Sequence, residues 1–365
     1  MRILFCGGGT AGHITPAIAL AEELSESDKN EIAFVGRFEG KENILILNEG
    51  YKLYTIHSIG LQRSSVFKNF KTFYLNMRAI SDSIKIIKEF HPDLVFGTGG
   101  YVCFPVLTAA KLLRIPTAMH ESNSCPGLVT RLIGKQCTKL FTGFEIPELK
   151  KRKNVFISGT PVRKCFSNIS KAEARKRIGI PEKSFFVLSI GGSGGAEKIN
   201  ENAIKLMKRY SLMTPEVYHV HVTGEKYYEK IKEIEPVMAK GTARCKILPF
   251  ILNMNEYLSA TDVIITRCGA ITLSEIAICG TIPILIPSPN VADNHQLKNA
   301  QSFIANGAGI LIEEKSLSCE ELIRVIDDLR TDKDKREKMS LLIKRSANKY
   351  AREKIISEIS KIIKP

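Results

Sequence analysis

Short apolar runs rich in β-branched residues alternate along the chain with stretches of helical length that carry one apolar face. Apolar strands that alternate with helices are typical of a parallel sheet covered on both faces. The predicted strands span residues 3–6, 32–35, 94–96, 117–120 and 140–142, and then 186–190, 219–223, 246–249, 263–266 and 284–286. This alternation predicts the doubly wound α/β class.

The same plan occurs twice along the chain. Residues 1–24 read as strand, glycine-rich loop and helix, and residues 185–208 repeat that order. Downstream, DLVFGTGGYVCFPVLTAAKLL at 93–113 is matched by DVIITRCGAITLSEIAICG at 262–280. Two Rossmann-like halves predict a cleft between them, in which a nucleotide and a second substrate could meet.

The domain limits follow from the repeat. A turn-rich segment near 158–164 follows the last predicted strand of the first half, and the chain closes with basic helical residues. We expect a first Rossmann-like domain over 1–161 and a second over 162–340. We expect a C-terminal helix over 341–365 to pack back on the first domain.

Residues 59–78, here named the aromatic–basic segment, have no counterpart in the second half. The segment mixes aromatic and methionine side chains with lysine and arginine, and a helix would gather the apolar ones on one face. Such a face is typical of a helix at a membrane surface. The alternative is a helix that packs its aromatic face on the sheet, and both can hold along one helix.

Net charge and hydropathy limit the kinds of partner that the protein can bind. The formal net charge is +15, which favours phosphates, nucleic acids or anionic lipid, although a solvated lysine-rich surface would also produce it. The chain carries none of the zinc-finger, basic-zipper or RNA-binding patterns, so nucleic acid is not expected as the main partner. Apolar runs stay below the ~18–20 residues that span a bilayer, and the N-terminus lacks a signal-peptide pattern. We expect a cytoplasmic protein.

The nine cysteines are scattered without any C-x-x-C pair. This spacing argues against a disulfide framework and favours small buried side chains. Cys268 is the exception in position, because it falls in a glycine-rich loop. The spacing of cysteine, histidine and carboxylate residues suggests no catalytic metal site.

Four glycine-rich loops connect a predicted strand to a predicted helix, at 7–13, 97–101, 191–196 and 267–275. Glycine lets the backbone approach a ligand, and a helix N-terminus offers unpaired N–H groups to an anion. An NAD-dependent dehydrogenase would carry an acidic residue at the end of the strand that follows the first glycine-rich loop and its helix. Here that strand ends in Gly36–Arg37, which argues against NAD and leaves NADP open. The chain also lacks a Walker A motif, so it is not a P-loop ATPase.

The motifs together resemble a known family. TAGHITPAIALAEEL, TGGYVCFPVLTAAKLL, HESNSCPGL, SGTPVR, GGSGGA and RCGAITLSEIAICG…DNHQLKNA occur in order over about residues 1–345. They resemble the MurG family, the UDP-N-acetylglucosamine (UDP-GlcNAc) transferases of peptidoglycan synthesis, which have the GT-B fold.

The resemblance implies an inverting enzyme without a cofactor, and no obligatory metal is expected. N-acetylglucosamine would pass from UDP to the C4 hydroxyl of the muramyl sugar of undecaprenyl-pyrophosphoryl-MurNAc-pentapeptide (lipid I), giving lipid II. It also implies peripheral attachment to an anionic membrane surface at the cytoplasmic face, with the acceptor and membrane on the first domain and the donor on the second.

The resemblance also implies the residues that bind UDP-GlcNAc. Arg163 and Ser193 would lie at the phosphates, and the backbone of Ile251 at the uracil. Glu275 would accept hydrogen bonds from the ribose, and Gln296 would contact the sugar. The remaining donor contacts would be Thr10, Ala11, Gly12, Asn123, Ala270, Ile271, Thr272, Leu273 and Ser274.

His13 is the first candidate for the catalytic base. It lies on the first glycine-rich loop, and the ordinary pKa of histidine suits proton transfer near neutral pH. Its alternative role is to position the substrate or contact a phosphate. Glu121 is the second candidate base, and its alternative role is a hydrogen bond to a loop.

Four positions depart from the family pattern, namely Ala11, Ser122, Thr160 and Gly194, and they leave details of the substrate contacts open. Another GT-B lipid glycosyltransferase, a UDP-sugar epimerase of similar shape, and a non-catalytic scaffold that binds UDP-sugar remain alternatives. HESNSCPGL and DNHQLKNA favour the peptidoglycan enzyme over other lipid glycosyltransferases. The intact His13, Arg163, Glu275 and Gln296 argue against the scaffold.

Overall fold

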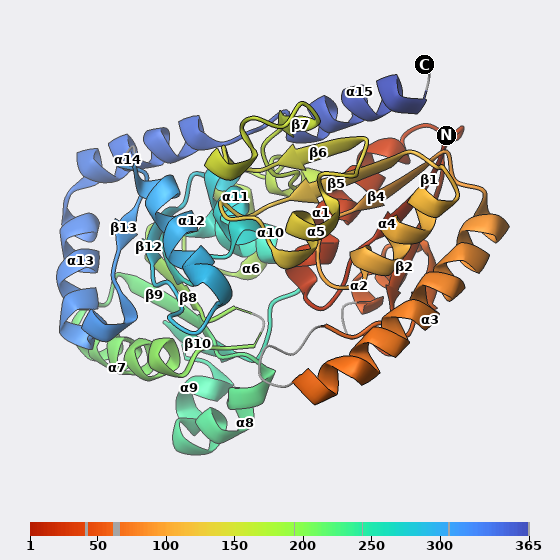
Figure 1. Ribbon diagram of the computed structural model, residues 1–365. Coiled ribbons are helices and arrows are strands. Elements are labelled where there is room, and N and C mark those ends of the chain that lie inside the picture. Colours follow the sequence, from red (N-terminus) through yellow and green to blue (C-terminus); the bar gives the residue numbers. More distant parts are fainter. Residues whose placement is uncertain (41–42, 61–65, 193, 243, 306, 364–365) are drawn as a thin grey trace. The chain divides into compact units, whose positions relative to one another are not determined.

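The computed structural model describes residues 1–40, 43–60, 66–192, 194–242, 244–305 and 307–363 in two compact units (Figure 1). Unit 1 comprises Met1–Lys164 together with Asn348–Pro365, and unit 2 comprises Cys165–Ala347. The limits predicted for the domains, 161/162 and 340/341, fall three and seven residues before the limits of these units. Each unit is built on its own parallel sheet, so the predicted doubly wound α/β class is confirmed.

The sheet of unit 1 has the order β3-β2-β1-β4-β5-β6-β7, with all neighbours parallel. Its strands are β1 (Arg2–Cys6), β2 (Glu31–Arg37), β3 (Lys52–Ile56), β4 (Leu94–Gly97), β5 (Thr117–Glu121), β6 (Lys139–Thr142) and β7 (Val155–Ile157). Its helices are α1 (Ala11–Leu24), α2 (Asn43–Asn48), α3 (Val66–Phe90), α4 (Cys103–Leu112), α5 (Leu128–Ile133), η1 (Pro147–Leu149) and α15 (Ala351–Ile363).

Successive residues of the central strands face opposite sides of this sheet, and both sides are covered. On one side Leu4 and Val95 lie in the apolar cluster formed with α3 and α4. On the other side Phe5 and Phe96 lie in the cluster formed with α1 and α15. Burial on both faces explains why these strands read as continuous apolar runs.

The chain returns to unit 1 at its end. Ile355 and Ile359 of α15 are fully buried in the cluster on the α1 side of the sheet. Lys139 Nζ lies 2.7 Å from Glu358 Oε2. The buried Arg352 donates from NH1 to Val162 O at 2.6 Å. The last helix therefore packs as an integral layer of unit 1.

The sheet of unit 2 has the order β10-β9-β8-β11-β12-β13, again parallel. Its strands are β8 (Phe185–Ile190), β9 (Val217–Val222), β10 (Cys245–Leu248), β11 (Val263–Thr266), β12 (Ile282–Leu285) and β13 (Ile310–Leu311). Its helices are α6 (Lys171–Ile178), α7 (Glu197–Met213), α8 (Glu225–Ile234), α9 (Pro236–Lys240), α10 (Met254–Ala260), α11 (Ala270–Cys279), α12 (His295–Ile304), α13 (Cys319–Thr331) and α14 (Lys333–Ser346), with the short turns η2 (Lys164–Phe166), η3 (Ala292–Asn294) and η4 (Glu314–Ser316).

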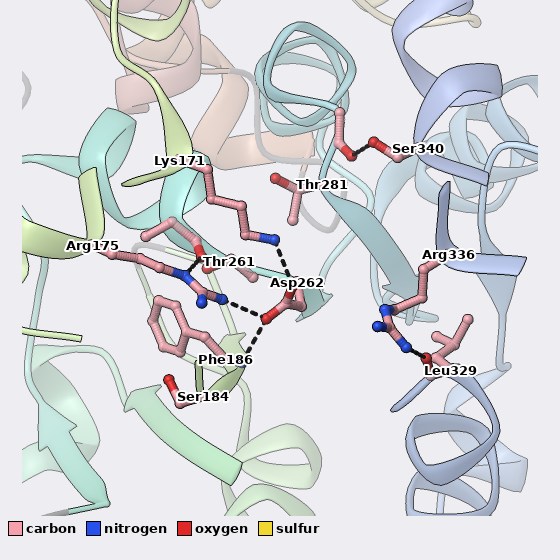
Figure 2. A network of polar contacts seen from close by, with 12 residues as sticks. Lys171, Arg175, Ser184, Phe186, Thr261, Asp262, Thr281, Leu329, Arg336 and Ser340 are labelled. Carbon is pink, nitrogen blue, oxygen red and sulfur yellow. Dashed lines mark hydrogen bonds and ion pairs between the residues drawn. The ribbon is translucent and has the colours of Figure 1, made fainter. Parts of the chain in front are cut away.

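Asp262 joins three elements at the amino end of this sheet (Figure 2). Its carboxylate accepts hydrogen bonds from Arg175 NH2 and from the backbone N–H of Phe186, both at 2.7 Å, and pairs with Lys171 Nζ at 2.5 Å. Arg175 also donates to Ala260 O at 3.1 Å. Because α6 is fixed there to β8 and β11, the amino end of the sheet is held by polar contacts within unit 2.

Two buried histidines share one serine inside unit 2. The hydroxyl of Ser189 on β8 lies 2.8 Å from both His219 Nε2 and His221 Nδ1 on β9. Burial lowers the pKa of both imidazoles, that of His221 to about 4. Both rings are therefore neutral at physiological pH.

All the predicted strands are present, whereas β3, β7 and β13 are missing from the prediction. β3 and β7 form the edges of the first sheet and β13 one edge of the second, and they are only partly buried. Edge strands carry polar residues such as Lys52, which weakens the apolar signal. Among the described residues, no helix has the length and hydropathy needed to cross a bilayer.

Candidate functional site

In each unit the glycine-rich loops follow strands of a parallel sheet and therefore gather at its carboxyl edge, where such folds bind ligands. Of the four glycine-rich loops, those after β1 and β4 belong to unit 1 and those after β8 and β11 to unit 2, and the loops after β5 and β12 lie at the same edges. Each unit thus carries its own set of candidate residues.

The first two loops of unit 1 lie against each other around His13. Gly100 has a φ of +80°, and a Cβ there would collide with Gly8 O, so only glycine fits. A Cβ on Gly99 would lie 2.8 Å from His13 Cδ2, and Thr98 Oγ1 donates to His13 O at 2.5 Å. The backbone and the ring of His13 are thereby fixed by the loop after β4.

The hydrogen bonds of His13 select a tautomer. Its Nδ1 lies 3.0 Å from Gly8 O and 3.2 Å from Thr10 Oγ1. A carbonyl oxygen can only accept, so Nδ1 carries the proton and Nε2 is the basic nitrogen of the neutral ring. In this tautomer the neutral ring can accept a proton at Nε2.

The other predicted residues of the first loop open α1. Thr10 is the exposed residue before the helix, and Ala11 and Gly12 begin it. A helical residue has negative φ, so an alanine in place of the family's glycine at position 11 imposes no strained backbone.

Glu121, at the end of β5, is engaged on both carboxylate oxygens. Oε1 accepts from the N–H and the Nδ2 of Asn123, at 3.0 and 3.1 Å. Oε2 accepts from Gly127 N at 2.8 Å and Thr130 Oγ1 at 2.7 Å. These bonds hold the start of α5 and the loop before it, which favours the loop-fixing role of Glu121 over the role of a base.

The neighbouring His120 and Ser122 form a buried pair. Ser122 Oγ lies 3.1 Å from His120 Nδ1, and His120 Nε2 lies 3.1 Å from Gly159 O. Burial lowers the pKa of His120 to about 4, so the ring is neutral. Ser122, one of the four residues that differ from the family pattern, thus gives His120 a hydrogen-bond partner. Thr160, another of the four, has a buried hydroxyl without a hydrogen bond to any described residue.

Arg163 lies in unit 1 and is paired with two carboxylates. Its Nε is 2.6 Å from Glu22 Oε1, and its NH2 is 2.7 Å from Glu49 Oε1. A contact with the phosphates of UDP-GlcNAc, its predicted role, would have to compete with these two ion pairs. Of the described residues predicted to bind UDP-GlcNAc, Arg163, Asn123 and those of the first loop lie in unit 1, and all the others lie in unit 2.

In unit 2 the N-terminus of α11 follows the loop after β11. Gly269 precedes the helix with a φ of −67° and a ψ of 134°, and the first turn contains Ala270, Ile271 and Thr272 without an acidic side chain. The backbone N–H groups at such an end suit a phosphate. Ala270 and Leu273 are buried, Ser274 Oγ donates to Ala270 O at 2.9 Å, and Glu275 is 9% exposed.

Two side chains of α12 hold this loop at Cys268. Gln296 Oε1 accepts from Cys268 N at 3.3 Å and from Ser288 N at 2.9 Å. Asn299 Nδ2 donates to Cys268 O at 3.2 Å. We name Gln296 and Asn299 the α12 bracket. Because Oε1 of Gln296 accepts from backbone, its Nε2 is the atom suited to donate to a sugar oxygen.

Arg267 adds a further support to the same loop. Its NH1 donates to Ile286 O at 3.2 Å, and its NH2 pairs with Glu314. Sequence reasoning missed Arg267, Asn299 and Glu314. Arg267 and Asn299 lie inside motifs by which the family resemblance was identified. Asn299 also follows Gln296 by three residues, a spacing that places both side chains on the same face of a helix.

The remaining candidates are placed as follows. Ile251 is buried in the segment between β10 and α10. Ser193 lies outside the described residues. Burial raises the pKa of the Cys268 thiol to about 12, so this cysteine is unreactive. Within the described ranges, no group of three or more histidine, cysteine or carboxylate residues could hold a metal ion.

Two family models match the chain. The glycosyltransferase family 28 N-terminal domain matches residues 3–142, and the family 28 C-terminal domain matches residues 186–355. Together they cover most of both units.

Curated relatives match over nearly the whole chain. One from Thermoanaerobacter sp. (strain X514) is 38% identical, covering 100% of this chain and 99% of the relative. Another from Caldanaerobacter subterraneus is 40% identical, covering 91% of this chain and 92% of the relative. Both are named UDP-N-acetylglucosamine–N-acetylmuramyl-(pentapeptide) pyrophosphoryl-undecaprenol N-acetylglucosamine transferase.

Solved structures share the fold. MurG of Acinetobacter baumannii has a TM-score of 0.72 at 24% identity, covering 99% of each chain. A UDP-GlcNAc 2-epimerase of Neisseria meningitidis bound to UDP-GlcNAc has a TM-score of 0.70 at 16% identity, covering 99% of this chain and 100% of the epimerase. These scores are too close to separate transferase from epimerase.

Proposed function

Because the chain belongs to glycosyltransferase family 28, we propose that it transfers N-acetylglucosamine from UDP-GlcNAc to lipid I and so forms lipid II for peptidoglycan. The observation that carries this proposal is the 36–40% identity, along almost the whole chain, to relatives named for that reaction. The two sets of loops described above supply the chemistry.

Unit 2 is the donor side of the proposed reaction. The N–H groups at the start of α11 face the pyrophosphate and stabilise the negative charge that grows on departing UDP. The α12 bracket keeps the loop before α11 in place, and Nε2 of Gln296 donates to the sugar. Glu275 accepts from the ribose, and the backbone of Ile251 holds the uracil.

Unit 1 is the acceptor side. The C4 hydroxyl oxygen of the muramyl sugar attacks the anomeric carbon of the donor, and the bond from that carbon to the phosphate oxygen breaks with inversion. His13 Nε2 takes the hydroxyl proton. Thr10, Ala11 and Gly12 lie beside His13 and approach the transferred sugar. Glu121 keeps Asn123 and the start of α5 in position.

Attachment to a membrane surface is part of the same proposal. The aromatic–basic segment and the net charge of +15 support peripheral binding to anionic lipid at the cytoplasmic face. Residues 61–65 of this segment lie outside the described residues, and α3 begins at Val66. Sedimentation with anionic vesicles tests the attachment: loss of binding in Phe67→Ser and Phe70→Ser supports it, and unchanged binding contradicts it.

An acceptor assay tests the function itself. The protein is incubated with radiolabelled UDP-GlcNAc and lipid I, and label in the lipid fraction is measured. We expect transfer, with UDP-N-acetylgalactosamine and UDP-glucose at least tenfold poorer. Incubation without acceptor is the control for an epimerase. Formation of the 2-epimer of UDP-GlcNAc, with no label in lipid, would replace the transferase by the epimerase.

A further inference from the structure

Ser58 is a buried serine outside the predicted site that joins two loops to a helix. It follows β3, is 1% exposed, and donates to Asn76 Oδ1 on α3 at 3.0 Å. The same hydroxyl lies 3.4 Å from Tyr101 O, in the loop after β4. Asn76 in turn donates from Nδ2 to Ile59 O at 3.2 Å. We name Ser58 and Asn76 the α3 clamp.

The ring of Tyr101 strengthens the same junction. A Cβ on Gly9 would lie 2.9 Å from Tyr101 Cε1, and a Cβ on Gly60 would lie 3.1 Å from Tyr101 Cδ1. The ring therefore packs directly against both the loop after β1 and the segment after β3. Side-chain rotation of Tyr101 is limited by backbone on both sides.

These contacts continue to His13. Tyr101 follows Gly99 and Gly100, where an added Cβ would collide with the His13 ring and with Gly8 O, respectively. The path from Asn76 to Ser58, to the backbone of Tyr101 and to His13 consists of packed, described residues within unit 1. A shift of α3 relative to β3 would move the loop that fixes the imidazole.

We propose that Ser58 and Asn76 are positioning residues for the acceptor half of the reaction. They hold the loop after β4 so that His13 Nε2 meets the acceptor hydroxyl. The proposal rests on the proposed function for its kinetic consequence, but its structural consequence, the environment of His13, can be measured without turnover.

The kinetic test compares Ser58→Ala and Asn76→Ala with Ser83→Ala. Ser83 is a matched control, because it is buried like Ser58 and lies on α3 like Asn76, and among the described residues its hydroxyl donates to Ala79 O, one turn back, at 2.7 Å. We expect kcat/KM for lipid I to fall about tenfold in Asn76→Ala and less in Ser58→Ala, because the loss of a hydrogen bond changes an equilibrium by about that factor. The Kd for UDP-GlcNAc should stay within about twofold. Equal losses in Ser83→Ala, or an equal rise in the UDP-GlcNAc Kd, would overturn the proposal.

A second measurement separates this proposal from the proposed function. The imidazole resonances of His13 are followed through a pH titration by NMR, with His13→Gln to assign them. We expect the titration midpoint and the Nδ1 shift to change in Asn76→Ala and to stay as in wild type in Ser83→Ala. Unchanged His13 resonances in Asn76→Ala refute the coupling even if transfer is slow. Absence of transfer in the wild type would instead refute the function and leave the coupling to be decided by NMR.

The variant Asn76→Asp tests which hydrogen bond of Asn76, the one to Ser58 or the one to Ile59, couples α3 to His13. It keeps an oxygen for Ser58 but replaces the donor to Ile59 O by a carboxylate oxygen, which repels that carbonyl. An effect on His13 as large as that of Asn76→Ala would assign the coupling to Ile59, and a smaller effect would assign it to Ser58. A His13 signal identical to that of wild type in both variants would overturn the clamp altogether.

Discussion

His13 and Glu121 are both candidate bases by residue type, and the contacts around them separate their roles. The carboxylate of Glu121 is engaged on both oxygens by groups that fix a loop and the start of α5. His13 is held through Nδ1, which leaves Nε2 as its basic nitrogen. Such assignments depend on which neighbours the fold brings to a side chain, and residue type alone leaves them open.

The first prediction concerns Glu121→Gln. A glutamine amide presents one acceptor oxygen, so some of the donors around position 121 would lose their partner, at about 1–3 kcal/mol of unfolding free energy. We expect lower stability by urea unfolding, while the acidic limb of the pH–kcat profile remains. Glu145→Gln, an exposed control paired with Lys150, should change stability by less than about 0.5 kcal/mol. Loss of the acidic limb in Glu121→Gln would make Glu121 the base.

At the scale of elements, the central strands and the glycine-rich loops were predictable because burial on both faces and the strand–glycine–helix order are local signals. The edge strands β3, β7 and β13 give weak apolar runs. The α12 bracket was predictable only in part. Gln296 could be assigned from its motif, but its bond to Cys268 N and the role of Asn299 depend on how α12 packs beside the loop after β11, which no local pattern encodes.

The α12 bracket leads to a prediction for Asn299→Ala. In this variant the carbonyl of Cys268 loses the hydrogen bond from Asn299. Because the loop before α11 is then held less firmly, the N–H groups of α11 are less well placed to bind the pyrophosphate. We expect the KM for UDP-GlcNAc to rise about tenfold, with the KM for lipid I unchanged. Asn202→Ala is the control, since Asn202 is buried and, among the described residues, its side chain donates to Lys198 O in its own helix. A similar effect in both variants would exclude a specific role for the bracket.

At the scale of the whole molecule, both units bury neutral histidines, and stability should therefore depend on pH. The unfolded chain binds protons on His120, His219 and His221 near pH 6.5, whereas burial lowers the pKa of all three in the folded state. The unfolded state thus binds more protons below pH 6.5. The contribution of these histidines to the free energy of unfolding is greatest above pH 6.5 and falls as the pH decreases toward 4.

The corresponding prediction is made for His221→Gln. Wild-type protein should lose about 2–3 kcal/mol through His221 alone between pH 7 and pH 4.5, because its folded pKa is about 4. Urea unfolding at these two pH values should therefore show a smaller difference in the variant. An identical difference in variant and wild type would mean that His221 is not neutral in the folded protein.

The return of α15 to unit 1 has a consequence for synthesis on the ribosome. Unit 2 is continuous in the chain, whereas unit 1 needs Ile355 and Ile359 to close one side of its sheet. At ~5–20 residues per second, the nascent first sheet waits roughly ten to forty seconds for them. During that interval the apolar surface beside α1 lacks its cover and is open to non-native apolar contacts.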